Sequence, residues 1–309
     1  MKYVVVGAGG VGGYFGARLA ADGNEVAFLA RGVHGEAMRR SGLTIKSPLG
    51  DLCIDKPDVP ANISDIGLVD VILFCVKLWD IDAAAAQIKP LLAHDTALIP
   101  FQNGVTSCDR LTELLGPRHV MGGVAKISAV IESPGVIRHH GPLAMLIFGE
   151  RDGAASWRQD GMSAACQSAG IEHKVSTAID RDIWEKFVML APLAGAACFY
   201  RMPVGGIISE PDRHALLAEL MRETAAVGLA ADVALDDDLV ERTLRQVSKF
   251  DSSIKPSMLV DLERGRRLEL EWLTGEVVRL GRNLDVPTPA SSKVFDALKP
   301  YANGASGAA

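Results

Sequence analysis

The chain has 309 residues, of which 48% are hydrophobic and 23% charged, a composition typical of globular proteins. Its length gives room for about two domains and excludes a small fold held together only by disulfides or metals. The net charge of −6 gives the surface no general attraction for a phosphate backbone, so nucleic acid is not an expected partner. The five cysteines show no C-x-x-C spacing, which favours free thiols in a reducing compartment and predicts a cytoplasmic location.

Two apolar stretches resemble targeting or membrane segments. The first, near the N-terminus, contains five glycines that would break the helix of a signal peptide. The second, residues 187–200, includes Pro192 and Gly195 and is shorter than the ~20 residues that span a bilayer. We therefore expect no membrane association and interpret the second stretch as a buried helix.

The first half of the chain alternates short apolar runs with helical stretches. Uninterrupted apolar runs are typical of strands buried on both faces of a parallel sheet. We expect such strands at residues 3–6, 26–29, 71–76 and 97–101, with helices at 10–21, 79–92 and 107–115. Shorter alternating segments at 120–148 predict antiparallel strands that close this sheet, followed by a helix at 157–169 and a last strand at 171–175.

Beyond residue 177 the strand pattern disappears. Helices are expected at residues 179–200, 211–231, 238–248, 257–282 and 289–299. The sequence thus predicts a Rossmann-type α/β domain over residues 1–176 and an all-helical domain over 177–302. Residues 303–309, made of Ala, Gly, Ser and Asn, are expected to form a disordered tail.

A glycine motif follows the first expected strand directly. It reads Gly7-Ala8-Gly9-Gly10-Val11-Gly12 and fits G-x-G-x-x-G. In a dinucleotide-binding fold the first glycine permits a tight turn, the second lets the backbone approach a pyrophosphate, and the third allows close packing of helix on strand. The motif is weak alone, but its place between a strand and a helix makes it a strong prediction of a dinucleotide site.

The residue after the second expected strand bears on the cofactor. An acidic side chain there would bind the free 2′-hydroxyl of NAD, whereas this chain has Arg31, whose planar guanidinium matches a 2′-phosphate. NADP(H) is therefore the predicted cofactor, the alternative being a solvated arginine. Lys77 and Asn103 follow the next two strands and would lie along the same edge of the sheet, although a lysine and an Asn-Gly turn are also common in such places.

The helical part contains one candidate acid and two candidate carboxylates. Lys186 lies on one helical face with Leu190 and Ala194, where partial desolvation would lower the lysine pKa and make it a better proton donor. The alternative is a lysine that extends to solvent. In the expected helix 257–282, Glu269 and Glu276 share the apolar row, and a buried carboxylate needs a partner. Lys186 with Glu269 is the simplest catalytic pair.

Metal catalysis has little support in the sequence. His139 and His140 are adjacent on an expected strand and would point to opposite faces, and no His-x-x-x-His or Cys/His cluster occurs. The run Asp236-Asp237-Asp238 could bind a cation, but acidic residues before a helix more often stabilise its N-terminus. No metal site is predicted.

With these residues in place, the chain up to about residue 300 resembles the ketopantoate reductase (2-dehydropantoate 2-reductase) family. The matching segments are the glycine motif, Arg31, Val76-Lys77, Gln102-Asn103-Gly104, Ile183-Trp184-Glu185-Lys186, Lys255-Pro256-Ser257-Met258, Asp261, Gly265-Arg266 and Leu268-Glu269. The resemblance implies a Rossmann domain joined to a helical domain. It also implies an oxidoreductase that uses NADPH to reduce the C2 carbonyl of ketopantoate to pantoate, a step of pantothenate and coenzyme A synthesis.

The resemblance further implies roles for individual residues. Lys186 would protonate the carbonyl oxygen, and Glu269 would hold Lys186 and the reacting oxygen or the nicotinamide ribose. Ser257 would bind the substrate carboxylate, and Asn103 would bridge nicotinamide and substrate. Lys77 and the backbone near Ser128 would support the cofactor. The expected partner is a small 2-oxo acid, and the chain would act as a monomer or homodimer.

The chain departs from the family pattern at three positions. Where the best-known members carry asparagines that grip the substrate, this chain has Leu190, Ala194 and Val204. Loss of hydrogen-bonding groups changes which polar ligands a pocket selects. Two alternatives to ketopantoate reduction therefore stay open: reduction of a different 2-oxo acid, and NADP(H) binding without catalysis.

Overall fold

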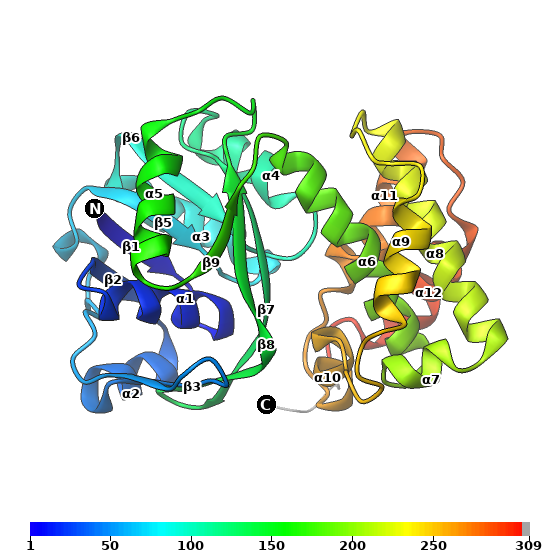
Figure 1. The fold of residues 1–309 in the computed structure, drawn as a ribbon, viewed down its shortest axis with the longest axis horizontal. Coiled ribbons are helices and arrows are strands. Elements are labelled where there is room, and N and C mark those ends of the chain that lie inside the picture. Colours follow the sequence, from blue (N-terminus) through cyan, green and yellow to red (C-terminus); the bar gives the residue numbers. More distant parts are fainter. Residues whose placement is uncertain (305–309) are drawn as a thin grey trace. The chain divides into compact units, whose positions relative to one another are not determined.

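Four parallel strands form the first sheet of the computed structural model, which describes residues 1–304 (Figure 1). The strands are ordered β2-β1-β5-β6, and every neighbouring pair is parallel. Their bounds are β1 (Lys2–Val6), β2 (Glu25–Leu29), β5 (Val69–Phe74) and β6 (Leu92–Pro100). Their apolar residues are nearly all buried, as is typical of parallel strands that are covered on both faces of the sheet. The predicted parallel sheet is confirmed.

Five α-helices accompany these strands: α1 (Gly10–Ala21), α2 (Gly32–Ser41), α3 (Ile81–Ile88), α4 (Ser107–Leu115) and α5 (Trp157–Ser168). The expected helix 79–92 is shorter, because 3-10 turns η2 (Leu78–Asp80) and η3 (Lys89–Leu91) flank α3 and Pro90 lies in the second; a third such turn is η1 (Ile63–Asp65). The sequence did not predict α2, whose two glycines weaken its helical pattern.

A second sheet corrects one prediction. The strands β7 (Gly122–Ser133) and β8 (Val136–Gly149) pair antiparallel, but they do not close the first sheet. They join β3 (Leu43–Lys46), β4 (Leu52–Ile54) and β9 (Glu172–Val175) in the order β4-β3-β8-β7, with β9 also on β8. The prediction was wrong because β3 and β4 are too short to stand out in the sequence, although β3 supplies the partner of β8.

Helix α1 contacts strands of both sheets. Its glycines allow this: a Cβ on Gly16 would lie 2.5 Å from a methyl carbon of Val5 and 2.7 Å from the Phe28 ring. Val5, Phe28 and Ile137 belong to one apolar core with Phe15 and Leu19 of the helix. The start of α1, which carries the glycine motif, is therefore held firmly by the strands around it.

The second part of the chain is helical, as predicted. It comprises α6 (Ile179–Tyr200), α7 (Val204–Ile208), α8 (Pro211–Ala230), α9 (Leu239–Val247), α10 (Ser257–Glu263), α11 (Thr274–Asn283) and α12 (Pro289–Leu298), with 3-10 turns η4 (Leu270–Trp272) and η5 (Lys299–Tyr301). Their apolar faces form a separate core in which Phe187, Leu220, Leu259 and Val277 are almost fully buried.

The expected single helix 257–282 is wrong. The structure divides it into α10, η4 and α11. The break comes at Gly265, whose φ of +62° is a left-handed conformation that no α-helix contains. Glu269 therefore does not lie on a helical stripe with Met258 and Leu262, although it is buried.

By length and composition, one helix of residues 1–304 could cross a membrane: α6. However, 61% of its most apolar window is buried inside the protein, and core helices of folded domains have the same composition. Ala191, Ala196 and Cys198 of this helix are at most 1% exposed. The helix thus supplies the helical core, in agreement with the expected buried helix.

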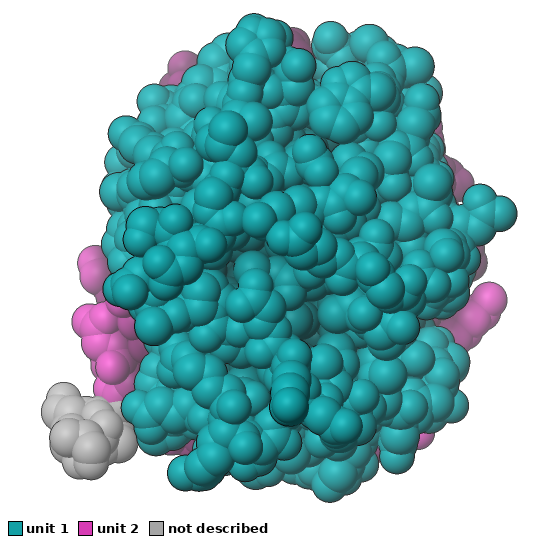
Figure 2. Space-filling view, turned by 90° about the vertical axis from the view of Figure 1, so that its left-hand side faces the viewer, with its two compact units in different colours: residues 1–102, 106–182 teal, residues 103–105, 183–309 magenta. Residues whose placement is uncertain are grey.

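The chain divides into two compact units, coloured separately in Figure 2. Unit 1 comprises residues 1–102 and 106–182, and unit 2 comprises residues 103–105 and 183 onward. Against the expected boundary at 176/177, the division lies inside α6, because the first turn of that helix bonds within unit 1: Arg151 pairs with Asp180 and Lys174 with Asp182. Of the expected tail 303–309, Asn303 and Gly304 end a turn on Tyr301, and 305–309 lie outside the described residues.

Candidate functional site

Two glycines at the turn between β1 and α1 could not be replaced by any other residue. Gly7 has a φ of +92°, and a Cβ there would lie 2.8 Å from the Val76 amide nitrogen. A Cβ on Gly12 would lie 2.4 Å from the Gly7 carbonyl oxygen and 2.8 Å from a Val5 methyl carbon. The first and last glycines of the motif thus serve the turn and the packing of α1 on β1.

Gly9 differs from these two glycines, because a Cβ at this position would meet no atom within 4 Å. Gly9 is the N-cap of α1; no side chain caps the helix and no acidic residue stands in its first turn. Among residues 1–304 the Gly9 amide has no hydrogen-bond acceptor. Open space, an available N–H and a positive helix end are what a bound phosphate needs, so these residues fit a dinucleotide.

The strand β7 borders the same turn. A Cβ on Gly10 would lie 2.1 Å from the carbonyl oxygen of Ala129, so only glycine allows β7 to approach this closely. The pairing of β7 with β8 shifts register between Ile127 and Ser128, and such irregularities often occur beside functional sites. Ser128, named from the family resemblance, directly precedes Ala129, the residue that lies against Gly10 of the motif.

Two charged residues follow strands of the first sheet at its carboxyl edge. Arg31 comes after β2 and is the N-cap of α2; its Nη2 donates to Gln87 Oε1 at 3.1 Å, and Nη1 lies 4.0 Å from Asp80 Oδ1. Lys77 comes after β5, with its Nζ 5.6 Å from the centre of the Trp79 ring. Because β1, β2 and β5 are parallel, both residues share an edge of the sheet with Gly7.

Unit 2 contains the candidate catalytic residues. Lys186, in the second turn of α6, donates from Nζ to Asn103 Oδ1 at 3.0 Å. Asn103 donates from Nδ2 to Glu269 Oε2 at 3.4 Å. Only one orientation of the amide serves both neighbours, since an ammonium can only donate and a carboxylate only accept. We refer to Lys186, Asn103 and Glu269 as the lysine–amide–carboxylate chain.

The two buried acids proposed from the sequence have different surroundings. Glu269 is 5% exposed and precedes η4, with the Asn103 amide beside it. Glu276 is also 5% exposed, but it forms an ion pair with Arg279 one turn along α11. Glu276 thus pairs within its own helix, whereas Glu269 is joined to Lys186 through Asn103.

The remaining substrate candidates lie on other elements. Ser257 begins α10 and is exposed, and it takes part in no hydrogen bond described for residues 1–304. Leu190 is partly buried, while Ala194 and Val204 are 1% and 0% exposed and pack in the helical core. These three side chains offer no donor or acceptor. Lys186 donates instead to Asn103, which in turn bonds to Glu269.

The sequence analysis missed His34. This residue of α2 is 8% exposed and contacts the glycine motif through the Ala8 carbonyl oxygen, 3.0 Å from its Nε2. Burial lowers its pKa, more strongly than the Ala8 contact raises it. No repeat or spacing in the sequence marks a single histidine as part of a site. In residues 1–304, no group of three or more His, Cys, Asp or Glu residues could hold a metal ion.

Comparisons with known proteins find relatives that match nearly the whole chain. The family profiles described as ketopantoate reductase PanE/ApbA and its C-terminal part match residues 3–153 and 178–302. A relative in Bacillus subtilis (strain 168), the oxidoreductase YkpB, described as uncharacterized, is 30% identical and covers 97% of this chain and 99% of its own. The crystal structure of a PanE/ApbA family ketopantoate reductase from Ralstonia eutropha JMP134 is 29% identical, with a TM-score of 0.89 and 98% of each chain covered.

A more distant structure has the same fold. D-mandelate dehydrogenase, solved with NADH and anilino(oxo)acetate, has a TM-score of 0.89 over 98% of each chain at 21% identity. At this identity the likeness shows the fold alone. One fold thus carries different 2-oxo acid chemistries, and the substrate has to be argued from the residues of each chain.

Proposed function

The chain belongs to the ketopantoate reductase family of oxidoreductases, and from that premise we propose that it reduces 2-dehydropantoate (ketopantoate) to pantoate with NADPH. The observation that carries this proposal is the lysine–amide–carboxylate chain, in which Asn103 joins Lys186 to Glu269. It provides a proton donor, a group that orients it and a carboxylate, within one unit. The reaction would serve pantothenate synthesis.

For this reaction the protein has to position the reacting groups and to stabilise the negative charge that develops on the carbonyl oxygen. A bound reduced nicotinamide supplies a hydride to C2 of the substrate. Lys186 then serves as the acid: its Nζ–H stabilises the negative charge that develops on the carbonyl oxygen and gives that oxygen its proton. Asn103 fixes the direction of the Nζ–H bonds, and Glu269 anchors the amide from the other side. Such preorganised donors account for much of the catalysis of charge-developing reactions.

The preference for NADPH is supported by Arg31. Its exposed guanidinium follows β2, the place at which dinucleotide folds meet the adenosine ribose. Gln87 holds one side of the guanidinium at 3.1 Å, which leaves further N–H groups for a 2′-phosphate. The Asp80 carboxylate, 4.0 Å from Nη1, partly offsets the positive charge of the Arg31 guanidinium.

The first experiment measures oxidation of NADPH and of NADH with ketopantoate and with a panel of other 2-oxo acids. The proposal expects the highest kcat/KM with NADPH and ketopantoate. Binding of NADPH without oxidation under any 2-oxo acid would instead support a protein that binds the dinucleotide and does not catalyse.

The second experiment replaces the proposed acid. Lys186→Ala should lower kcat by about 100-fold to 10,000-fold, the usual contribution of a positioned proton donor, and leave the Kd for NADPH nearly unchanged. Lys249→Ala, which removes an exposed lysine of the same unit, is the matched control and should keep wild-type turnover. Full activity of Lys186→Ala would show that the acid is assigned wrongly.

One observation favours a second candidate, reduction of a 2-oxo acid with a larger apolar group. Leu190, on the same face of α6 as Lys186, and the buried Ala194 and Val204 present no hydrogen-bonding groups. Side chains of this kind discriminate poorly in favour of a polar substrate. A kcat/KM for a branched or aromatic 2-oxo acid well above that for ketopantoate would establish this candidate in place of the pantothenate role.

A further inference from the structure

His34 bonds to two separate parts of unit 1 with its two ring nitrogens. Nε2 lies 3.0 Å from the carbonyl oxygen of Ala8, in the glycine motif. Nδ1 accepts the amide hydrogen of Gly135 at 3.1 Å, in the turn between β7 and β8. The side chain is buried, so water does not substitute for either partner.

These two partners determine the form of the ring. An amide N–H can only donate, so Nδ1 must carry a lone pair, and a carbonyl oxygen can only accept, so Nε2 must carry the hydrogen. His34 is therefore neutral, with its proton on Nε2. This form agrees with the burial that lowers its pKa.

The bond to Ala8 has a consequence on the other side of the peptide group. In a planar trans peptide the C=O of one residue and the N–H of the next point in opposite directions. With the Ala8 carbonyl directed towards the buried ring, the Gly9 N–H is directed away from it. This is the amide that has no acceptor among residues 1–304, and the Cβ position of the same residue borders open space.

We propose that His34 is a positioning residue for the dinucleotide: by holding the Ala8 carbonyl, it keeps the Gly9 N–H turned towards the bound pyrophosphate. This inference rests on the proposed function, since it presumes a dinucleotide at the glycine motif. Without the bond, the Ala8–Gly9 peptide can rotate, because glycine tolerates almost any backbone conformation. Part of the binding free energy would then be used to order the loop.

The bond to Gly135 has a different role. It ties α2 to the turn between β7 and β8, where Gly135 has a φ of +79° and its carbonyl accepts from the Thr44 amide of β3. This contact stabilises unit 1 and does not touch the glycine motif. The two ring nitrogens can therefore be tested separately.

The test uses three variants of the full chain. His34→Gln places an amide nitrogen where Nε2 stood and keeps a donor for Ala8. His34→Asn places an amide oxygen where Nδ1 stood and keeps an acceptor for Gly135. His34→Leu removes both. The Kd for NADPH is measured by the change in cofactor fluorescence, and stability is measured by the urea midpoint.

We expect His34→Gln to bind NADPH nearly as the wild type does, while His34→Asn and His34→Leu bind about tenfold or more weakly, the size of one lost buried hydrogen bond. Stability should depend on the bond to Gly135, so the urea midpoint of His34→Asn should be higher than that of His34→Gln. In histidine-labelled NMR of the free wild type, His34 should show a hydrogen on Nε2 and none on Nδ1.

Three results would overturn the inference: equal NADPH affinity in all three variants, affinity that merely follows stability, or a hydrogen on Nδ1 in the free protein. These failures leave the proposed function standing as long as the wild type binds and oxidises NADPH. If the wild type binds neither NADPH nor NADH, the proposed function fails and the inference fails with it.

Discussion

Asn103 connects an amine and a carboxylate through the two ends of one amide group. Its Oδ1 accepts from Lys186 at 3.0 Å, and its Nδ2 donates to Glu269 at 3.4 Å. The longer second contact is the weaker one, so the amide holds the lysine more firmly than the glutamate holds the amide. Removal of Asn103 or of Glu269 should therefore act mainly through the position of the lysine.

Asn103→Ala should lower kcat by about 100-fold, the usual effect of displacing a reacting group by about 1 Å. NADPH affinity should fall much less than kcat, because the Ala variant still has the glycine motif and Arg31. Steady-state kinetics combined with a fluorescence titration separate the two quantities. An unchanged kcat would contradict the positioning role of the amide.

Arg31 bears on the choice between the two nicotinamide dinucleotides. Arg31→Ala should raise the KM for NADPH by about tenfold to a hundredfold, because a charge-assisted hydrogen bond contributes about 1.5–3 kcal/mol. The KM for NADH, which has no 2′-phosphate, should change little. Equal effects on both cofactors would show that Arg31 does not recognise that phosphate.

At the scale of the element, the start of α1 combines two kinds of glycine. Gly9 leaves open space at the N-cap, whereas Gly12 is surrounded by the Gly7 carbonyl and Val5. Replacing each glycine by alanine should therefore affect different properties: cofactor binding at Gly9 and stability at Gly12.

Gly9→Ala should fold with nearly wild-type stability and bind the dinucleotide weakly, because the new methyl group occupies space at the helix N-terminus. Gly12→Ala should lower the free energy of unfolding by about 1–3 kcal/mol, the usual cost of overpacking. Urea denaturation and NADPH titration of both variants check this. Loss of stability in Gly9→Ala alone would reverse the assignment.

A buried carboxylate caps another helix in unit 2. Glu223 of α8 accepts the backbone amides of Ala290 and Ser291, both at 2.7 Å, at the start of α12. Pro289 begins α12 without a capping side chain of its own, so α8 supplies the acceptor.

Glu223→Ala should lower the free energy of unfolding by about 1–3 kcal/mol, because one buried and one partly buried N–H group lose their acceptor. Glu219→Ala on the same helix is the matched control: its carboxylate pairs with Arg222 in an exposed position, and we expect a change within about 0.5 kcal/mol. Urea midpoints measure both. Similar values for the two variants would contradict the capping role.

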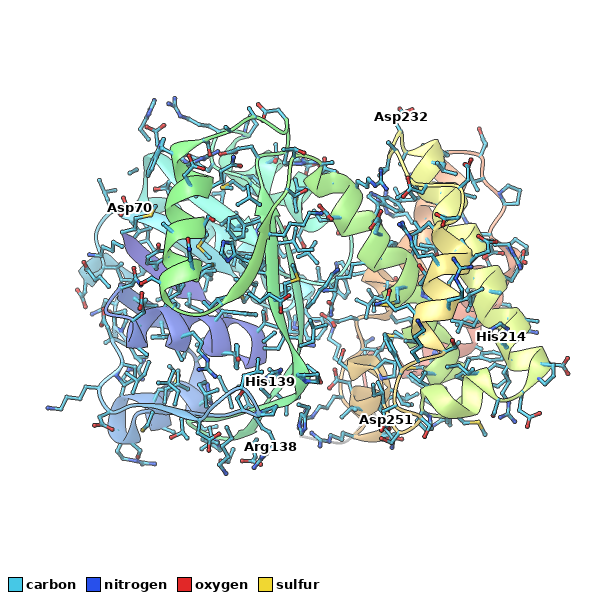
Figure 3. The ribbon with its side chains drawn as sticks, viewed as in Figure 1. Asp70, Arg138, His139, His214, Asp232 and Asp251 are labelled. Carbon is cyan, nitrogen blue, oxygen red and sulfur yellow. The ribbon has the colours of Figure 1, made fainter. Side chains whose placement is uncertain are left out.

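At the scale of the whole molecule, two buried histidines link stability to pH. Burial is the main cause that lowers the pKa of His34 and of His139 below 6.5; for His139, Arg18 and His140 add to the effect. His139, labelled in Figure 3, lies on β8 and contacts Ser47 Oγ and the Leu143 carbonyl. Below pH 6.5 the unfolded chain binds protons that the folded chain does not.

Stability should therefore be complete above about pH 6.5 and decrease as the pH falls from there towards the lowered pKa values. His34→Gln, which cannot titrate at this position, should show a shallower decrease than the wild type. Urea midpoints between about pH 5 and pH 8 measure this dependence. An identical slope in His34→Gln and wild type would refute it.

Patterns with a strong local cause were predictable from the sequence. The buried parallel strands, the glycine turn and the apolar helix α6 each follow from composition and spacing, and the structure contains all three. The short strands β3 and β4 were missed because tertiary pairing forms them and not local preference. The helix α2 was missed because its two glycines weaken the helical pattern. The break at Gly265 was missed because one glycine inside a helical pattern is ambiguous until its φ is known.

The candidate site shows the same limit. Glu269 was selected through a helix that does not exist, yet its burial next to a polar group was anticipated from the cost of isolating a carboxylate. Nothing in the linear order shows that Asn103 is grouped with residues 183 and beyond, or that His34 reaches Ala8. Both depend on contacts between distant segments.

The grouping of residues 103–105 with unit 2 bears on how this gene could be divided or recombined. A fragment starting at residue 177 would encode the amine of Lys186 and the acid of Glu269 but not the asparagine that joins them. In a chimera of two homologues spliced there, one parent would contribute the bridging amide and the other the groups it bridges. Activity of such hybrids would then depend on the match between parents at a position far upstream of the splice.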